Sequence, residues 1–135
     1  MFEGMPYLTE IKGLETWNTS NAICFAQMFS GCPKLEKLDL SGFDTRKAKA
    51  DGTYTSQNGS KASCTESMLA GLKSIKEIKL GENFTMSGNG TASANKIGVL
   101  PTPASGYWYN AETGQAYATN EIPNLTAATY VSTQP

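Results

Sequence analysis

MFSGCPKLEKLDLSGFDT, residues 28–45, is the stretch on which a prediction of the fold depends. Its central run LEKLDL follows the L-x-x-L-x-L pattern that is typical of leucine-rich repeats. Leu38 and Leu40 alternate there with Lys37 and Asp39, as they would in a short strand that buries one face. The stretch therefore predicts a strand unit whose apolar side chains need neighbouring units to cover them.

Two further copies of this unit flank the stretch. Each copy starts with a methionine, an apolar residue and, three positions after the methionine, a glycine; the starts are Met1, Met28 and Met68. The run before the third start carries Ser63 and Glu66 at capping-box spacing, which predicts a short helix before each start. Each unit is thus expected to run strand, turn, helix, turn.

These units predict the fold class and its first segments. We expect an α/β fold, a short leucine-rich-repeat-like solenoid with a parallel β ladder and short helices over residues 1–84. Residues 48–61 form an insert in the second unit and are expected to project as a hairpin around Tyr54. An irregular connection rich in Ser, Gly and Asn follows over residues 85–99.

Residues 100–135 are expected to form a compact antiparallel β element after the repeats. The aromatic run at 107–109 is followed by a turn and a second aromatic strand, and residues 127–131 favour one strand more. Capping the open end of the repeats is one interpretation of this element. The other is carbohydrate or cell-wall binding, because Trp108 and Tyr109 offer rings on which sugars can stack.

Charged residues of alternating sign form two outward rows if the strands stack in parallel register. The first row is Glu10, Lys37 and Glu77, and the second row is Lys12, Asp39 and Lys79. Opposite charges on neighbouring strands stabilise a sheet by about 0.2–1 kcal/mol per pair. The rows are therefore interpreted either as stabilising ladders or as a polar binding face, in which Lys37, Asp39 and Lys79 are the expected contacts.

The cysteines and two aromatic residues are assigned mainly to packing. Cys32 occupies a position that is apolar in the other units, so we expect it to be buried. Trp17 and Phe43 occupy equivalent positions and are expected to stack in the core. Cys24 and Cys64 also occupy equivalent positions of adjacent units. These positions are compatible with a disulfide between the two cysteines and equally with two unbridged residues.

The composition argues against catalysis and against several classes of partner. The chain has no histidine, which is the usual general base near neutral pH and the commonest metal ligand. Its net charge of −1 gives no bias toward nucleic acid, and no apolar run approaches the ~20 residues of a membrane span. We therefore predict no enzyme activity, no metal, no cofactor, no nucleic-acid partner and no membrane insertion.

Residues 28–45 resemble the repeat of BspA-like leucine-rich-repeat surface proteins of bacteria. The runs IKLGENFT at 78–85, LPTP at 100–103 and AATY at 127–130 are similar to the segment that closes such arrays. The resemblance implies a secreted or wall-attached protein of a host-associated bacterium that adheres to host proteins or to other cells. It implies no catalytic residues.

The function expected from the sequence is binding at a cell surface. The first hypothesis is an adhesion or scaffold module that contacts a protein, such as a host matrix protein, through the outward strand positions and the insert around Tyr54. The alternative is glycan or cell-wall binding through Trp108 and Tyr109. We also expect the chain to be part of a longer array and to self-associate through an unpaired strand edge near residues 8–12.

Overall fold

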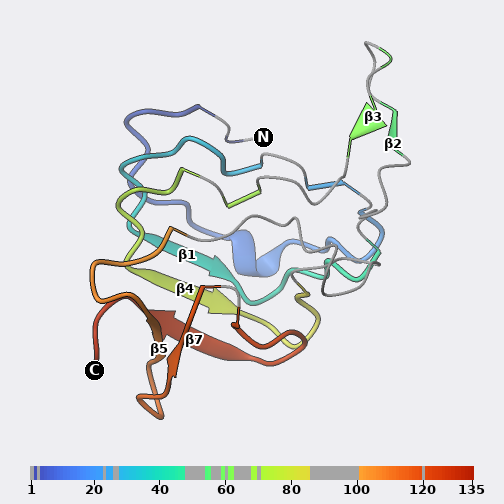
Figure 1. Ribbon diagram of the computed structural model, residues 1–135. Coiled ribbons are helices and arrows are strands. Elements are labelled where there is room, and N and C mark those ends of the chain that lie inside the picture. The colour runs from blue at the N-terminus through green and yellow to red at the C-terminus, as the bar shows by residue number, and fades with distance from the viewer. Residues whose placement is uncertain are drawn as a thin grey trace.

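The computed structural model describes residues 2, 4–22, 24–25, 28–47, 54–55, 59, 61–62, 68–69, 71–85, 101–119 and 121–135. In this part of the chain a five-stranded mixed sheet has the strand order β1-β4-β7-β5-β6 (Figure 1). Its strands are β1 (Lys37–Leu40), β4 (Glu77–Leu80), β5 (Trp108–Asn110), β6 (Ala116–Tyr117) and β7 (Ala128–Val131). No helix among the described residues is long and apolar enough to cross a membrane.

The predicted fold class is wrong, because the described residues form a small mixed sheet and not a helix-containing solenoid. Their only helical element is the single 3-10 turn η1 (Leu14–Thr16). The physical reason lies in the backbone hydrogen bonds. The Phe2 N–H donates to the Met28 carbonyl at 2.8 Å and the Phe29 N–H donates to the Met68 carbonyl at 3.0 Å, so these donors serve the neighbouring unit. The predicted capping box at Ser63 lies outside the described residues.

The three Met-x-x-Gly segments nevertheless correspond to one another in space. Gly4, Gly31 and Gly71 all have positive φ, at 68°, 72° and 75°, which an L side chain rarely adopts. A Cβ on Gly71 would lie 3.1 Å from the backbone nitrogen of Gly31, and a Cβ on Gly31 would lie 3.6 Å from that of Gly4. The repeat therefore predicted the order of these turns.

The pairing of β1 with β4 confirms the predicted parallel register. Lys37 lies opposite Glu77 and Asp39 lies opposite Lys79. Leu38 and Leu40 on β1, with Ile78 and Leu80 on β4, turn to the other face and are buried. Beyond the strands, a Cβ on Gly81 would collide with the backbone carbonyl of Ser41. The two backbone segments that follow β1 and β4 are therefore packed as closely as glycine permits.

The C-terminal segment adds the remaining strands to the same sheet. β7 pairs antiparallel with β4, and β5 pairs antiparallel with both β7 and β6. The predicted hairpin is confirmed by the pairing of Trp108 with Tyr117. Trp108 and Tyr130 are almost fully buried, at 0% and 1% exposure, and belong to the same core cluster as Leu80. This segment therefore covers the edge of β4 and shares one core with the repeats.

Buried threonines connect the loops that follow the strands. The Asp44 N–H donates to Thr19 Oγ1 at 2.7 Å. The Thr45 hydroxyl donates to the Thr85 carbonyl at 2.9 Å, and the Thr85 N–H donates to Thr45 Oγ1 at 2.8 Å. Thr45 is fully buried. The Thr45 hydroxyl thus adds two hydrogen bonds to the backbone hydrogen bond from the Thr45 N–H to the Asn83 carbonyl, at 3.2 Å, that joins the same two loops.

The first unit departs from the other two. No strand is present at residues 8–12, so the predicted strand edge there is wrong and β1 is the edge strand of the sheet. Gly13 has a φ of 87° and begins the η1 turn, which interrupts the extended backbone. Trp17 stacks on Phe43 at 6.4 Å between ring centroids and is 36% exposed, so it packs at the border of the core.

Of the two described cysteines, one is a free thiol and the other is disulfide-bonded. Cys32 is free and buried, as predicted, and its Sγ donates to the Phe2 carbonyl at 2.9 Å. Cys24 is disulfide-bonded. Cys64, on which the disulfide prediction depends, lies outside the described residues.

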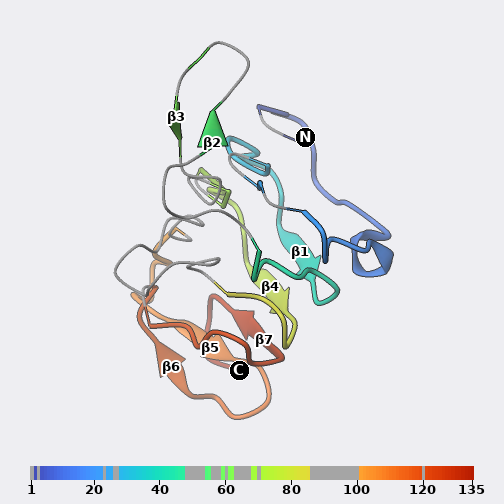
Figure 2. The same cartoon turned by 90° about the vertical axis from the view of Figure 1, so that its right-hand side faces the viewer.

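A second, two-stranded sheet lies in the region of the predicted insert. β2 (Tyr54–Thr55) pairs antiparallel with β3 (Lys61–Ala62). Figure 2 shows this pair projecting away from the five-stranded sheet. The other residues of the predicted insert, except residue 59, lie outside the described part of the chain.

Candidate functional site on the outer face of the sheet

The five-stranded sheet has one face that packs on the core and one that faces solvent. Successive side chains along each strand point to opposite faces, and the strand registers align the outward-pointing ones across the sheet. We call this surface the outer face; it consists of Lys37, Asp39, Glu77, Lys79, Tyr109, Thr129 and Val131. The outer face joins residues from the second unit, the third unit and the C-terminal segment.

The charged half of the outer face is built from β1 and β4. Lys37 Nζ lies 4.0 Å from Glu77 Oε2, with side-chain exposures of 73% and 39%. An ion pair that exposed contributes about 0–1 kcal/mol. Asp39 Oδ1 accepts the Ser41 N–H at 3.0 Å, which fixes the carboxylate at the end of β1. Lys79 lies between Asp39 and Thr129 in the sheet and forms no ion pair with any described residue.

Two hollows open on this charged half. The first has a volume of about 360 Å³ and is lined by Glu10, Ile11, Lys37, Leu38, Asp39, Glu77, Lys79 and Thr129. The second has a volume of about 410 Å³ and is lined by residues near the ends of β4 and β7, together with Asn110 and Glu112 of the β5–β6 hairpin. Lys79 and Thr129 line both hollows, so the two are adjacent. Together they form a groove across β1, β4 and β7.

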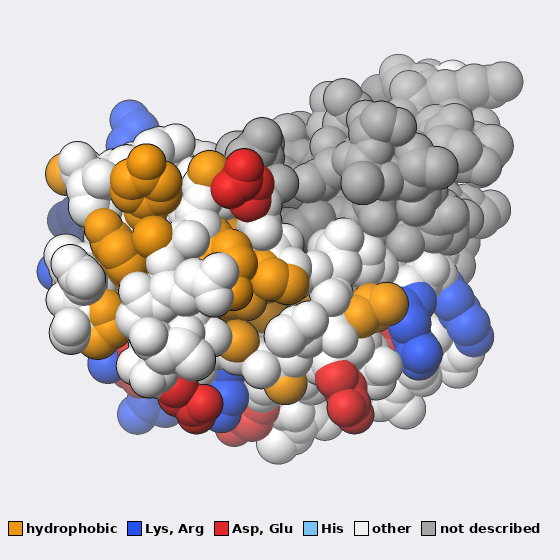
Figure 3. Space-filling model, turned by 60° about the horizontal axis from the view of Figure 1, so that its bottom comes forward, with side chains coloured by type: hydrophobic (Ala, Val, Ile, Leu, Met, Phe, Trp, Pro, Cys, Tyr) orange, Lys and Arg blue, Asp and Glu red, His pale blue; other side chains and the backbone are white. Residues whose placement is uncertain are grey.

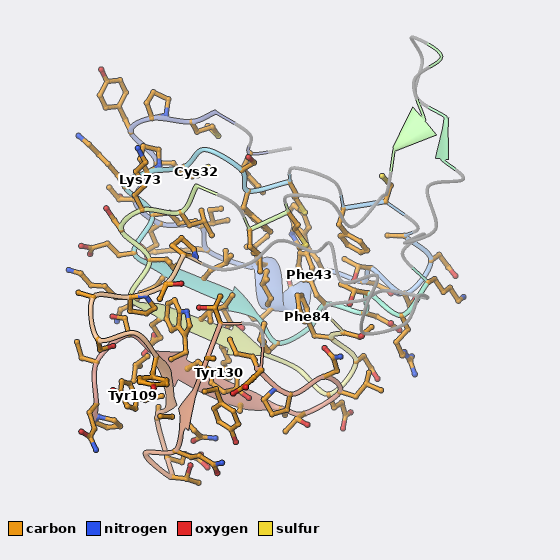
Figure 4. The ribbon with its side chains drawn as sticks, viewed as in Figure 1. Cys32, Phe43, Lys73, Phe84, Tyr109 and Tyr130 are labelled. Atoms are coloured by element: carbon orange, nitrogen blue, oxygen red, sulfur yellow. The ribbon has the colours of Figure 1, made fainter. Side chains whose placement is uncertain are left out.

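The other half of the outer face is aromatic and apolar. Tyr109 lies opposite Val131 in the sheet. The ring centroids of Tyr109 and Tyr107 are 6.5 Å apart at an interplanar angle of 60°, and Tyr107 is 48% exposed. In Figure 4, Tyr109 lies at the lower border of the molecule, whereas Phe43 and Phe84 lie in its interior. Tyr109 thus shares the outer face with the charged groove but lines neither of its hollows.

The structure brings most of the predicted site residues together and separates two of them. Lys37, Asp39, Lys79 and Tyr109 share the outer face. Trp108 alternates to the opposite side, where it is fully buried and its Nε1–H donates to the Pro101 carbonyl at 3.3 Å. The Tyr54 backbone lies in β2, away from this face, and its side chain lies outside the described part of the structure.

Sequence reasoning missed two carboxylates of the second hollow, Glu82 and Glu112. Glu82 follows β4, whereas Glu112 lies in the hairpin turn of the C-terminal segment. No spacing in the sequence links them, because their proximity depends on β7 pairing between β4 and β5. Figure 3 shows side chains of both charge signs mixed along the lower border, with hydrophobic side chains gathered to the left of centre.

A third hollow, of about 430 Å³, lies at the opposite end of β4. It lies between the turn at residues 72–76 and the loop at residues 101–105. Lys76 Nζ pairs there with Glu36 Oε1 at 3.0 Å, and the Ser105 hydroxyl donates to the Ser132 carbonyl at 2.9 Å. These polar groups already form an ion pair and a hydrogen bond within the protein. Fewer polar groups are therefore available to a ligand in this hollow than in the groove on the outer face.

The clearest electrostatic perturbation lies outside the groove, at Asp44. The Arg46 side chain donates from Nε to Oδ1 at 2.9 Å and from Nη2 to Oδ2 at 2.7 Å. These hydrogen bonds lower the pKa of Asp44, although burial opposes the shift. In the core, burial raises the pKa of Tyr130 and the nearby Tyr117 adds to this effect. Both shifts concern folding stability and not chemistry at an open site.

The described residues include no group of three or more metal-ligating side chains placed to hold a metal ion. No protein-family model, curated protein or solved structure matches the chain. The functional argument therefore rests on the geometry of the outer face.

Proposed function

We propose that this chain is a non-catalytic binding module that recognises another protein through its outer face. The observation that carries the proposal is the outer face itself, on which Lys37, Asp39 and Lys79 line a groove. The half-buried Tyr109 belongs to the same face of the sheet. Protein interfaces are enriched in tyrosine and are surrounded by polar and charged groups that set specificity. An exposed, hollowed sheet face with both features suits such recognition.

A role at the cell surface is part of the same proposal. Residues 28–45 resemble the repeat of bacterial surface adhesins, and we therefore propose adhesion to a host or cell-surface protein as the biological role. The disulfide at Cys24 supports this proposal, because disulfides persist in oxidising compartments outside the cytosol. The absence of histidine from the sequence favours binding over acid–base chemistry.

We do not propose carbohydrate binding through Trp108. A sugar-stacking platform needs an accessible ring face, and the Trp108 ring is fully buried beneath β5. Trp108 is instead part of the core with Tyr130.

Binding to a panel of immobilised matrix and cell-surface proteins tests the proposal. Any binding found should be weakened by Tyr109→Ala and by Asp39→Ala, since both side chains belong to the outer face. The control is Tyr7→Ala, which removes a tyrosine ring that is 80% exposed from a turn in the first unit, away from the outer face. A deletion of residues 48–61 tests the insert as a separate contact.

The same variants can also refute the proposal. If the outer-face variants fold and bind as the wild type does, this surface is not the binding site. If only the insert deletion abolishes binding, recognition belongs to the β2–β3 hairpin. Circular dichroism of each variant establishes that the sheet is intact.

A further inference from the structure

We infer that the partner docks a basic segment into the groove of the outer face, with one cationic side chain on each side of Lys79. This inference rests on the proposed function and specifies the chemistry of the partner. It follows from the charges in the two hollows, from the place of Lys79 between them, and from the presence of Tyr109 on the same sheet face.

The groove is far more acidic than the chain as a whole. Five carboxylates and two lysines line the two hollows, whereas the whole chain has a net charge of −1. One of these lysines, Lys37, lies within 4.0 Å of Glu77 and is partly neutralised there. The remaining carboxylates are Glu10, Asp39, Glu82 and Glu112. Charge complementarity therefore favours a positively charged occupant.

The carboxylates divide into two clusters with Lys79 between them. Glu10, Asp39 and Glu77 line the first hollow, and Glu82 and Glu112 line the second. Lys79 lines both and repels a cation placed directly over it. A partner with two separated basic side chains satisfies both clusters and avoids Lys79, whereas a single cation can occupy only one of them.

Another cation near the groove is already engaged. Arg46 is close enough to Glu82 for that charge to contribute to raising the Arg46 pKa. Its guanidinium group, however, forms the two-point hydrogen bond with Asp44. Arg46 therefore does not neutralise the second hollow as a free cation would.

The tyrosines supply a second mode of recognition for the same chemistry. Lysine and arginine bind the faces of aromatic rings at distances within about 6 Å of the centroid. The protein itself contains such a contact, in which Lys34 Nζ lies 5.2 Å from the centre of the Tyr7 ring. Tyr109 lines neither hollow but belongs to the same sheet face, so it offers a ring of this kind to a basic segment that extends beyond the groove.

The test uses the whole chain and a short fluorescent peptide that carries two lysines separated by a few small residues. Fluorescence anisotropy should show binding that weakens as salt rises, because the Debye length falls from about 30 Å at 0.01 M to about 8 Å at 0.15 M. The matched peptides carry two glutamates, or one lysine only. The two-lysine peptide should bind most tightly and the glutamate peptide should not bind.

Three sets of variants locate the site. The pair Glu82→Gln and Glu112→Gln should weaken the two-lysine peptide by about two- to twenty-fold, given the usual range for two exposed ion pairs. The control pair, Glu15→Gln and Glu121→Gln, removes the same charge from exposed positions outside both hollows and should change affinity far less. Lys79→Ala should tighten the peptide, an opposite sign that a loss of folding cannot produce.

Three results would overturn the inference. Equal weakening by the groove pair and the control pair would show that only total charge matters. Loosened binding in Lys79→Ala would show that an anionic group of the partner occupies the groove. If a matrix protein depends on Tyr109 while basic peptides fail to bind or to compete, the proposed function stands and the basic partner does not.

Discussion

Thr45→Val should destabilise the fold although it changes the shape of the side chain very little. The hydroxyl group of Thr45 donates to the Thr85 carbonyl at 2.9 Å and accepts the Thr85 N–H at 2.8 Å. Both bonds are buried, and Thr45 itself has no exposed surface. The substitution replaces the hydroxyl by a methyl group of similar size, so the main loss is the two hydrogen bonds.

The expected magnitude follows from the number of bonds. A hydrogen bond within a folded protein contributes a net 0.5–1.5 kcal/mol, so the loss of two lowers the free energy of unfolding by about 1–3 kcal/mol. The control is Thr16→Val, because the Thr16 hydroxyl also donates to a backbone carbonyl, that of Gly13, at 2.7 Å, but at an exposed position. Exposed substitutions usually change stability by less than about 0.5 kcal/mol.

Urea denaturation followed by tryptophan fluorescence measures the difference. Trp108 lies in the core and Trp17 packs at its border on Phe43, so one transition observed by both reports the whole fold. The midpoint for Thr45→Val should fall while the slope m stays unchanged, which marks a change in stability alone. If Thr45→Val lowers the free energy of unfolding no more than Thr16→Val does, the hydrogen bonds of the Thr45 hydroxyl do not stabilise the connection between the loops, and the reasoning is refuted.

Three further predictions concern pH and packing. The lowered pKa of Asp44 means that its pairing with Arg46 stabilises the protein at neutral pH. This contribution is lost as the pH falls through and below the ordinary value of 3.8. Asp44→Asn should therefore be less stable than the wild type at pH 7, and the difference between their urea midpoints should narrow in acid. The raised pKa of Tyr130 means that stability falls as the pH rises above 10.0, and Tyr130→Phe should reduce that alkaline loss in the same assay. Gly81→Ala should destabilise by about 1–3 kcal/mol, because its Cβ would collide with the Ser41 carbonyl; a thermal melt equal to that of the wild type would contradict this close approach.

Local sequence patterns predicted the pairing of the strands well. The alternation of Leu38 and Leu40 with charged neighbours is a property of any strand with one buried face. Equivalent residues in the repeat then set the register, which is why Lys37 lies opposite Glu77 as expected. The hairpin that pairs Trp108 with Tyr117 was also predictable, because both strands and their turn are adjacent in the chain.

The same patterns predicted helices that the described residues do not contain. A capping box and a glycine stop describe only local preference, and short helices have little stability without tertiary support. At Phe2 and Phe29 the backbone N–H groups instead donate to the neighbouring unit. Competition between local and long-range hydrogen bonds cannot be judged from residue spacing.

The sequence alone determined that charged side chains of β1 and β4 share an outward face, because strand periodicity and the repeat are encoded in adjacent residues. Only the tertiary structure decided what else lies on that face. The pairing of β7 with β4 places Thr129 and Val131 beside the charges, brings Tyr109 to the same surface and turns Trp108 into the core. The groove depends on this long-range pairing, since Glu82 and Glu112 come from segments that are distant in the chain and meet only in the folded sheet.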